Sequence, residues 1–217
     1  MNVSTLIKQY FTSHSNDVAI DVFDEKNIYD VYQRVIETLT QHVNIETTLL
    51  QALNYCFYEI LDNVLTHSGK ELGIVITHYN PDEHILSMLV ADDGRGIHSS
   101  LAENDKYATL TEPEALKMCI QDSVTDGKGM GFGLYSTSLL VRDAGLRFDI
   151  RSGSHTLRLQ NGETTILQSD IWQGTIIYLK LQTDKEINPA EVVANRTNVA
   201  EQYNETFLND IELKELW

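Results

Sequence analysis

The sequence has few of the residues that mark linkers or covalent frameworks. Three prolines and two cysteines occur in 217 residues, and there is no internal repeat, low-complexity run or segment rich in proline and glycine. A composition with 42% hydrophobic residues is nevertheless sufficient to bury a real core. We therefore expect one large domain rather than two small ones.

Basic residues are also scarce. The chain has 16 Lys and Arg against 32 Asp and Glu, which gives a formal charge of -16, and no segment gathers enough Lys and Arg to reverse it. Non-specific binding to nucleic acid or to an anionic membrane requires such a positive surface. The composition therefore argues against nucleic-acid and membrane partners.

Long apolar runs are missing as well. No segment approaches the roughly 18 consecutive apolar residues of a membrane-spanning helix. The N-terminal residues MNVSTLIKQY lack the charged region followed by an apolar region that a secretory signal requires. We expect a cytoplasmic protein.

The cysteines and histidines do not form a recognisable metal or disulfide pattern. Cys56 and Cys119 each lie within an apolar pattern of helical spacing, which favours two reduced, buried thiols. The seven histidines are scattered and lack the close spacing of a zinc site.

Apolar spacing predicts the elements of the first half of the chain. Residues 18–23 are typical of a strand, and residues 28–42 have the three- and four-residue spacing of a helix. A longer helix is expected over residues 45–67, ending at Ser68-Gly69. Two strand-like runs, GIVITHY and HILSMLV, flank the turn residues 80–83 and predict a hairpin.

The second half predicts a short helix at residues 112–121, a strong helix at 134–143 and three or four closing strands, LRFDIR, HTLRLQ, ETTILQ and TIIYLKL. This order favours an α+β fold, a two-layer sandwich whose mixed, mostly antiparallel sheet has helices on one face and a partly exposed second face. We expect an N-terminal strand and helix extension (1–45) packed on a central domain (46–183), followed by an acidic, partly helical tail (184–217).

Three polar residues recur at intervals of one helical turn. Glu59, Asn63 and His67 lie at i, i+4 and i+8 of the predicted long helix, so their side chains share one face. An amide oxygen can complete the ligand shell of Mg²⁺, and a carboxylate one turn away can deprotonate a water or hydroxyl. Taken alone, the same pattern also describes a solvated helix face.

A predicted strand runs directly into Asp92-Asp93-Gly94-Arg95-Gly96. Spaced glycines let the backbone approach a ligand closely, and a buried carboxylate requires a donor such as the exocyclic amine of adenine. Asp92, at the strand end, is the first choice for that contact, and Asp93 is a candidate for structural capping. An ordinary Asp-Gly turn is the alternative.

Glycines occupy every second position before the helix predicted at 134–143, in the run GKGMGFGL of residues 127–134. Free amides at a helix N-terminus form an anion site, and Lys128 adds a positive charge. The spacing matches neither a Walker loop nor a Rossmann fingerprint. A flexible glycine loop is the alternative.

In order, the motifs are E-x-x-x-N, D-x-G-x-G and G-x-G-x-G-L, followed by Gly174-Thr175 at the start of a strand. This order resembles the GHKL ATPase superfamily, with its Bergerat ATP-binding fold, over about residues 50–182. The family includes gyrase B subunits, MutL, heat-shock chaperones, histidine kinases and anti-sigma-factor serine kinases. The resemblance implies ATP and Mg²⁺ as cofactors.

Carried over by position, the resemblance implies Asn63 as the Mg²⁺ ligand, Glu59 as the general base and Asp92 as the partner of the adenine amino group. Gly94 and Gly96 would line the base pocket, and Thr175, if it is more than an ordinary strand residue, would help hold Asp92 and a water. The residues implied around the phosphates are Lys128, Gly129, Met130, Gly131, Phe132, Gly133 and Leu134. Residues 98–128 correspond to the mobile lid of the family, and His67 is either a phosphate contact or a surface histidine.

Among the members of this superfamily, small stand-alone and anti-sigma-type domains are most similar to the segments ALNYCFYEILDNVLTHS and GFGLYSTSLLVRDAGLRFDIRSG. The resemblance therefore implies a regulatory ATPase or protein serine/threonine kinase that acts on a protein partner. Three alternatives stay open: an ATP-gated binding switch with little catalysis, a histidine kinase catalytic module acting on a separate protein, and a structural domain with degenerate motifs. A homodimer is a further expectation. The tail, with Phe207, Leu208, Ile211, Leu213 and Leu216, is compatible with an amphipathic helix that docks on its own domain or on another chain.

Overall fold

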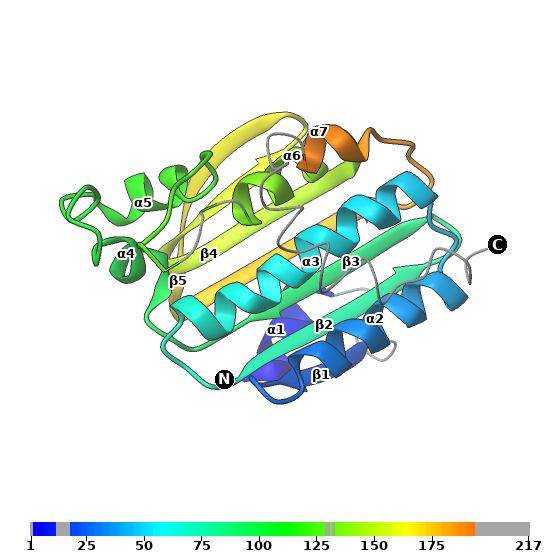
Figure 1. Cartoon of the computed structure of the whole chain (residues 1–217), viewed down its shortest axis with the longest axis horizontal. Helices are drawn as coiled ribbons and strands as arrows, with labels where there is room; N and C mark the ends of the chain where they lie inside the picture. Colours follow the sequence, from blue (N-terminus) through cyan, green and yellow to red (C-terminus); the bar gives the residue numbers. More distant parts are fainter. Residues whose placement is uncertain (1, 12–17, 129–130, 132, 194–217) are drawn as a thin grey trace.

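An antiparallel sheet of five strands forms the framework of the described residues (Figure 1). The computed structural model describes residues 2–11, 18–128, 131 and 133–193. The strand order is β1-β2-β3-β5-β4, and each neighbouring pair is antiparallel, so the expected mixed sheet is antiparallel throughout the described residues. The strands are β1 (Ala19–Phe23), β2 (Gly73–Asn80), β3 (Ile85–Ala91), β4 (Gly145–Gln160) and β5 (Glu163–Gln182).

Helices cover one face of this sheet and enclose the main core. Figure 1 shows α2 (Ile28–His42), α3 (Thr47–His67) and α6 (Gly133–Ala144) running across that face. Two short helices, α4 (Gly96–Leu101) and α5 (Glu112–Met118), lie together at one end of the molecule. The α+β class predicted from the sequence is confirmed.

Helix α3 provides most of the contact between the two layers. Its apolar residues recur every three or four positions, and Leu53, Ile60 and Leu61 have no exposed surface. The helix begins after Glu46, whose carboxylate accepts hydrogen bonds from the first backbone amides of the helix. The burial of this stripe fixes the rotation of α3, and with it the direction in which its polar residues point.

The second face of the sheet is partly covered by an N-terminal helix that the sequence pattern did not indicate. Helix α1 (Val3–Tyr10) buries Leu6 completely and packs with Phe11 against this face. The strands are apolar on both faces here, because Ile74 and Ile76 point toward α1 while Val75 between them joins the main core. The expectation that helices lie on one face only is therefore corrected.

The closing strands are longer than predicted. LRFDIR and HTLRLQ form one strand, β4, whose register shifts between Ser152 and His155, and ETTILQ and TIIYLKL form β5. Asn161 and Gly162 join them with φ values of 53° and 77°, as a two-residue hairpin turn requires. At the irregularity, the Glu112 carboxylate of α5 accepts hydrogen bonds from Ser154 and contacts Nδ1 of His155, which ties α5 to the sheet.

The remaining described residues follow β5. Helix α7 (Pro189–Val193) packs against α3 and α6, and the expected tail helix with Phe207 to Leu216 lies outside the described residues. Cys56 and Cys119 are buried and are not joined in a disulfide, as predicted. Within residues 2–11, 18–128, 131 and 133–193, no helix has the length and apolar character that a membrane span requires.

Candidate functional site

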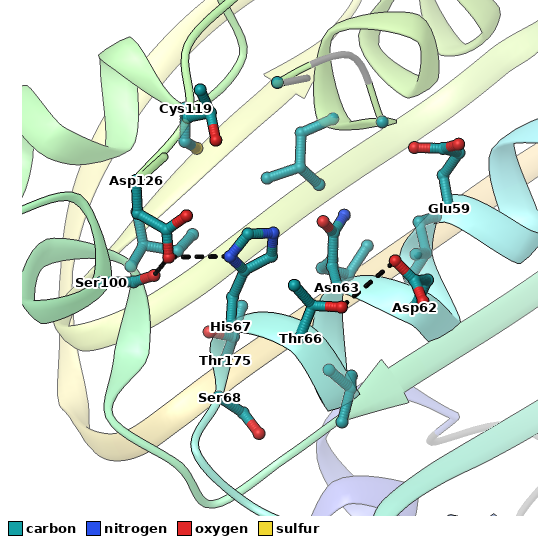
Figure 2. Close-up of a pocket in the computed structure, with 18 of the residues that line it drawn as sticks. Glu59, Asp62, Asn63, Thr66, His67, Ser68, Ser100, Cys119, Asp126 and Thr175 are labelled. Atoms are coloured by element: carbon teal, nitrogen blue, oxygen red, sulfur yellow. Dashed lines mark hydrogen bonds and ion pairs between the residues drawn. The ribbon is translucent and has the colours of Figure 1, made fainter. Parts of the chain in front are cut away.

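A cavity of about 370 Å³ lies between α3, the end of β3, α4 and the start of α6. Figure 2 shows that the side chains of Glu59, Asn63 and His67 project into it from α3. Gly94, which was expected to line the pocket, is not among the lining residues; its backbone amide donates to the Asp92 carboxylate. Gly129, Met130 and Phe132 lie outside the described residues. The predicted site residues that line the cavity are Glu59, Asn63, Asp92, Gly96, Lys128, Gly131, Gly133, Leu134 and Thr175.

Asp92 is a buried carboxyl group at the end of β3. Only 2% of its surface is exposed, and its neighbour Asp93 keeps 45% of its side chain exposed. The Asp92 carboxylate accepts the backbone amide of Gly94 at 2.8 Å and a backbone hydrogen bond from Thr175. Burial raises the pKa of Asp92 to about 6, and the two backbone hydrogen bonds only partly oppose this rise. A ligand that donates a hydrogen bond would compensate part of the cost of burying this group.

Two glycines allow the chain to close tightly around Asp92. A β-carbon at Gly94 would lie 2.2 Å from the carbonyl oxygen of Ser68. A β-carbon at Gly174, where φ is +99°, would lie 2.4 Å from the carbonyl oxygen of Asp92. Gly94 therefore allows the end of β3 to lie against the end of α3, and Gly174 allows β5 to lie against the backbone of Asp92.

Gly174→Ala is expected to destabilise the protein much more than Gly162→Ala. Both glycines have positive φ, so each substitution costs roughly 1 kcal/mol of backbone strain. A β-carbon at Gly162 meets open space, whereas at Gly174 it collides with backbone and adds about 1–3 kcal/mol. Urea unfolding of the two variants measures the difference, and equal losses of stability would show that the close packing around Asp92 is wrong.

The start of α6 lies against the polar face of α3. A β-carbon at Gly133 would be 3.1 Å from both Nδ2 of Asn63 and Oε2 of Glu59, so this position places the α6 backbone directly beside both side chains. Gly133 is the first residue of α6, and the first amides of a helix have no partner within the helix. An anion bound here would contact these amides and lie next to Asn63 and Glu59.

The site fits a Mg²⁺ ion that arrives with a polyphosphate. In the described part of the chain, no three His, Cys, Asp or Glu side chains are grouped closely enough to hold a metal ion. Mg²⁺ usually takes one or two protein oxygens and completes its shell with phosphate and water. The amide of Asn63 suits that role, because it faces the cavity beside Gly133.

A hydrogen-bonded group that sequence reasoning missed joins α3 to the segment before the glycine loop. The buried Asp126 carboxylate lies 2.8 Å from Nδ1 of His67 and accepts the Ser100 hydroxyl at 2.8 Å and the Lys128 amide at 3.0 Å. Burial raises the pKa of Asp126, but hydrogen bonds from His67 and Ser100 outweigh it and hold the pKa below its usual value. In the sequence, the position of Asp126 directly before the glycines of TDGKGMGFG could have marked it as a site residue.

Lys128 is held by an ion pair that its sequence context did not indicate. Its ammonium group lies 2.7 Å from Oε2 of Glu103, and the other carboxylate oxygen of Glu103 pairs with Arg95. Lys128 also lines the cavity, so it can contact an anionic ligand bound there. The three side chains link the start of α4, the segment after it and the glycine loop.

A known protein family matches the part of the chain that contains the cavity residues. Residues 49–185, more than half of the chain and including Glu59 to Thr175, match the family described as "Histidine kinase-, DNA gyrase B-, and HSP90-like ATPase". Among solved structures, the chain is similar to the 43K ATPase domain of Thermus thermophilus gyrase B in complex with an aminocoumarin, with 20% identity and a TM-score of 0.34. The alignment covers 81% of this chain and 45% of that chain, so this chain spans less than half of its length. No match was found among curated proteins.

Proposed function

The chain belongs to the family of histidine kinase-, DNA gyrase B- and HSP90-like ATPases, and on that premise we propose that it binds ATP and Mg²⁺ in the described cavity to regulate a protein partner. The observation that carries the proposal is the buried Asp92 carboxylate at one end of a cavity whose other end is formed by Asn63, Glu59 and the start of α6. The Asp92 end offers a hydrogen-bond acceptor, and the end at the start of α6 offers backbone amides that can bind phosphates.

The adenine ring occupies the Asp92 end in this proposal. Its exocyclic amine donates to the carboxylate, whose other hydrogen bonds come from the Gly94 and Thr175 backbone. The surrounding wall is apolar, with Ile97 and Ile177 among the lining residues. A flat, apolar ring with one donor suits such a wall, because the ring replaces water and the donor satisfies the buried acid.

The triphosphate then lies toward the start of α6. The backbone amides of Gly131 and Gly133 would donate to its anionic oxygens, and Lys128 would add a cation once it leaves Glu103. Asn63 would hold Mg²⁺ through its side-chain oxygen, and the ion would neutralise charge on the phosphates. This arrangement explains how a chain with a formal charge of -16 can bind a polyanion.

In this proposal Glu59 acts as the general base. Its carboxylate lies one helical turn before Asn63, on the cavity side of α3, beside the first residue of α6. There it can orient and deprotonate the oxygen that attacks the terminal phosphate. In a kinase of the anti-sigma type, that oxygen is a Ser or Thr hydroxyl of the partner; in an ATPase, it is water.

A phosphate-transfer assay distinguishes the candidate functions. Purified chain, Mg²⁺ and ATP labelled on the γ-phosphate are incubated with a co-purified partner. We expect label on Ser or Thr of the partner, which supports the kinase. Acid-labile label on a partner histidine would instead indicate a histidine kinase module, free phosphate alone an ATPase, and ATP binding with neither product a binding switch. A chain that does not bind ATP would contradict the whole proposal.

A further inference from the structure

His67 is held in one orientation by residues from two other segments. Its Nδ1 lies 2.8 Å from Oδ2 of Asp126, and the same oxygen accepts the hydroxyl of Ser100 in α4. The Asp126 side chain is 1% exposed, and the His67 side chain is 24% exposed. The buried Asp126 carboxylate thus fixes the orientation of the imidazole ring, and one edge of the ring stays accessible from the cavity.

The support also selects the tautomer of the ring. An ionised carboxylate can only accept hydrogen bonds, so Nδ1 of His67 carries the proton that points to Asp126. The neutral ring therefore presents Nε2 as an acceptor. Figure 2 shows Nε2 on the ring edge away from Asp126, on the side where Asn63 is drawn. No residue in the described ranges forms a hydrogen bond with this nitrogen.

The position of His67 along α3 identifies what this acceptor meets. Glu59, Asn63 and His67 are successive residues on one helix face, spaced roughly 6 Å apart along the axis. The next residue, Ser68, contacts the Gly94 turn that holds Asp92. His67 therefore lies between the end of the cavity assigned to adenine and the end assigned to the phosphates, where the sugar of a nucleotide must lie.

We propose that Nε2 of His67 accepts a hydrogen bond from a ribose hydroxyl of the bound nucleotide, with Asp126 and Ser100 positioning the ring, so that a nucleotide that lacks this hydroxyl binds more weakly. This inference rests on the proposed ATP site. Ribose hydroxyls are donors as well as acceptors, and water at a deoxyribose position would replace the contact imperfectly. His67 thus determines specificity, while Asp126 acts through it.

The test compares the affinities of ATP, 2′-deoxy-ATP and 3′-deoxy-ATP by calorimetry at pH 8 in the presence of Mg²⁺. We expect the wild-type chain to bind ATP about three- to tenfold more tightly than one of the deoxynucleotides, as a single hydrogen bond predicts. His67→Phe keeps a flat ring and removes the acceptor. It should lower the affinity for ATP to that for the deoxynucleotide and leave the affinity for that deoxynucleotide within about twofold of wild type.

Asp126→Asn provides a second route that leaves the ring in place. It should reduce the preference for ATP, and the ¹⁵N chemical shifts of His67 should show a mixture of tautomers instead of protonated Nδ1 alone. Equal wild-type affinities for all three nucleotides would overturn the inference, as would an equal loss for all three in His67→Phe. If the wild-type chain bound none of them, the proposed ATP site itself would be wrong.

Discussion

Asp92→Asn is expected to abolish ATP binding and yet to raise the stability of the nucleotide-free protein at neutral pH. The amide has no charge and only one acceptor oxygen, so its NH₂ group must face either the adenine amine or a backbone donor. The affinity should therefore fall at least about 100-fold, as for a buried donor left unpaired. The same substitution removes a carboxyl group that is costly to ionise where it is buried.

The pH dependence of this gain follows from the pKa. The folded pKa of Asp92 is about 6, above the ordinary aspartate value of 3.8. As pH rises between these values, the unfolded chain loses the proton while the folded chain keeps it, so the carboxyl group reduces stability by up to about 3 kcal/mol above pH 6. The amide of the Asp92→Asn variant does not ionise and has no such cost. Thermal unfolding should show a gain of several degrees at pH 8 and little difference near pH 4.

Asp93→Asn is the matched control for both effects. It removes the same charge from the neighbouring position, where the side chain is 45% exposed. ATP affinity and the pH dependence of stability should both stay close to wild type. Normal ATP binding by Asp92→Asn, or a loss of stability at pH 8, would contradict the role assigned to the buried carboxylate.

Glu59→Gln is expected to stop turnover while leaving ATP bound. The amide is nearly the same size and cannot take a proton, so the rate of phosphate release or transfer should fall about 10²- to 10⁴-fold. The ATP dissociation constant should change by less than about threefold, because the proposed site has Glu59 act on the attacking oxygen and not on adenine. Single-turnover kinetics with saturating ATP measures the chemical step directly.

Asp62→Asn controls for the loss of a negative charge near the phosphates. Asp62 also lines the cavity, lies less than one turn from Glu59 on α3, and contacts Thr66 at 3.3 Å. Its substitution should change the rate by no more than about twofold. A similar fall in both variants would mean that charge alone, and not a base at Glu59, supports turnover.

The elements that the sequence predicted are those with strong local patterns. Helix α3 was found because its apolar residues are regularly spaced and buried, and the turn after β3 was found because Asp92, Gly94 and Gly96 have a recognisable spacing. These signals depend on residues close together in the chain. The site residues of α3 and of the end of β3 line one cavity, because the polar face of the helix and the end of the strand both point into it.

The features that were missed depend on contacts between distant segments. Helix α1 is short, and only the second apolar face of the sheet explains why Leu6 is buried. Asp126 contacts Ser100, which lies 26 positions earlier in the chain, and His67, which lies 59 positions earlier. Lys128 likewise pairs with Glu103 from a separate segment. Single polar residues carry no periodicity, so their partners become evident only when the sheet and helices are in place.

A crystal structure with Mg²⁺ and a non-hydrolysable ATP analogue tests the central claim most directly. We predict the exocyclic amine of adenine within about 3 Å of the Asp92 carboxylate, as a hydrogen bond requires. We also expect the Mg²⁺ ion bound by Asn63 and the phosphates at the start of α6. A nucleotide bound elsewhere, or with its phosphates at the Asp92 end of the cavity, would contradict the proposed site.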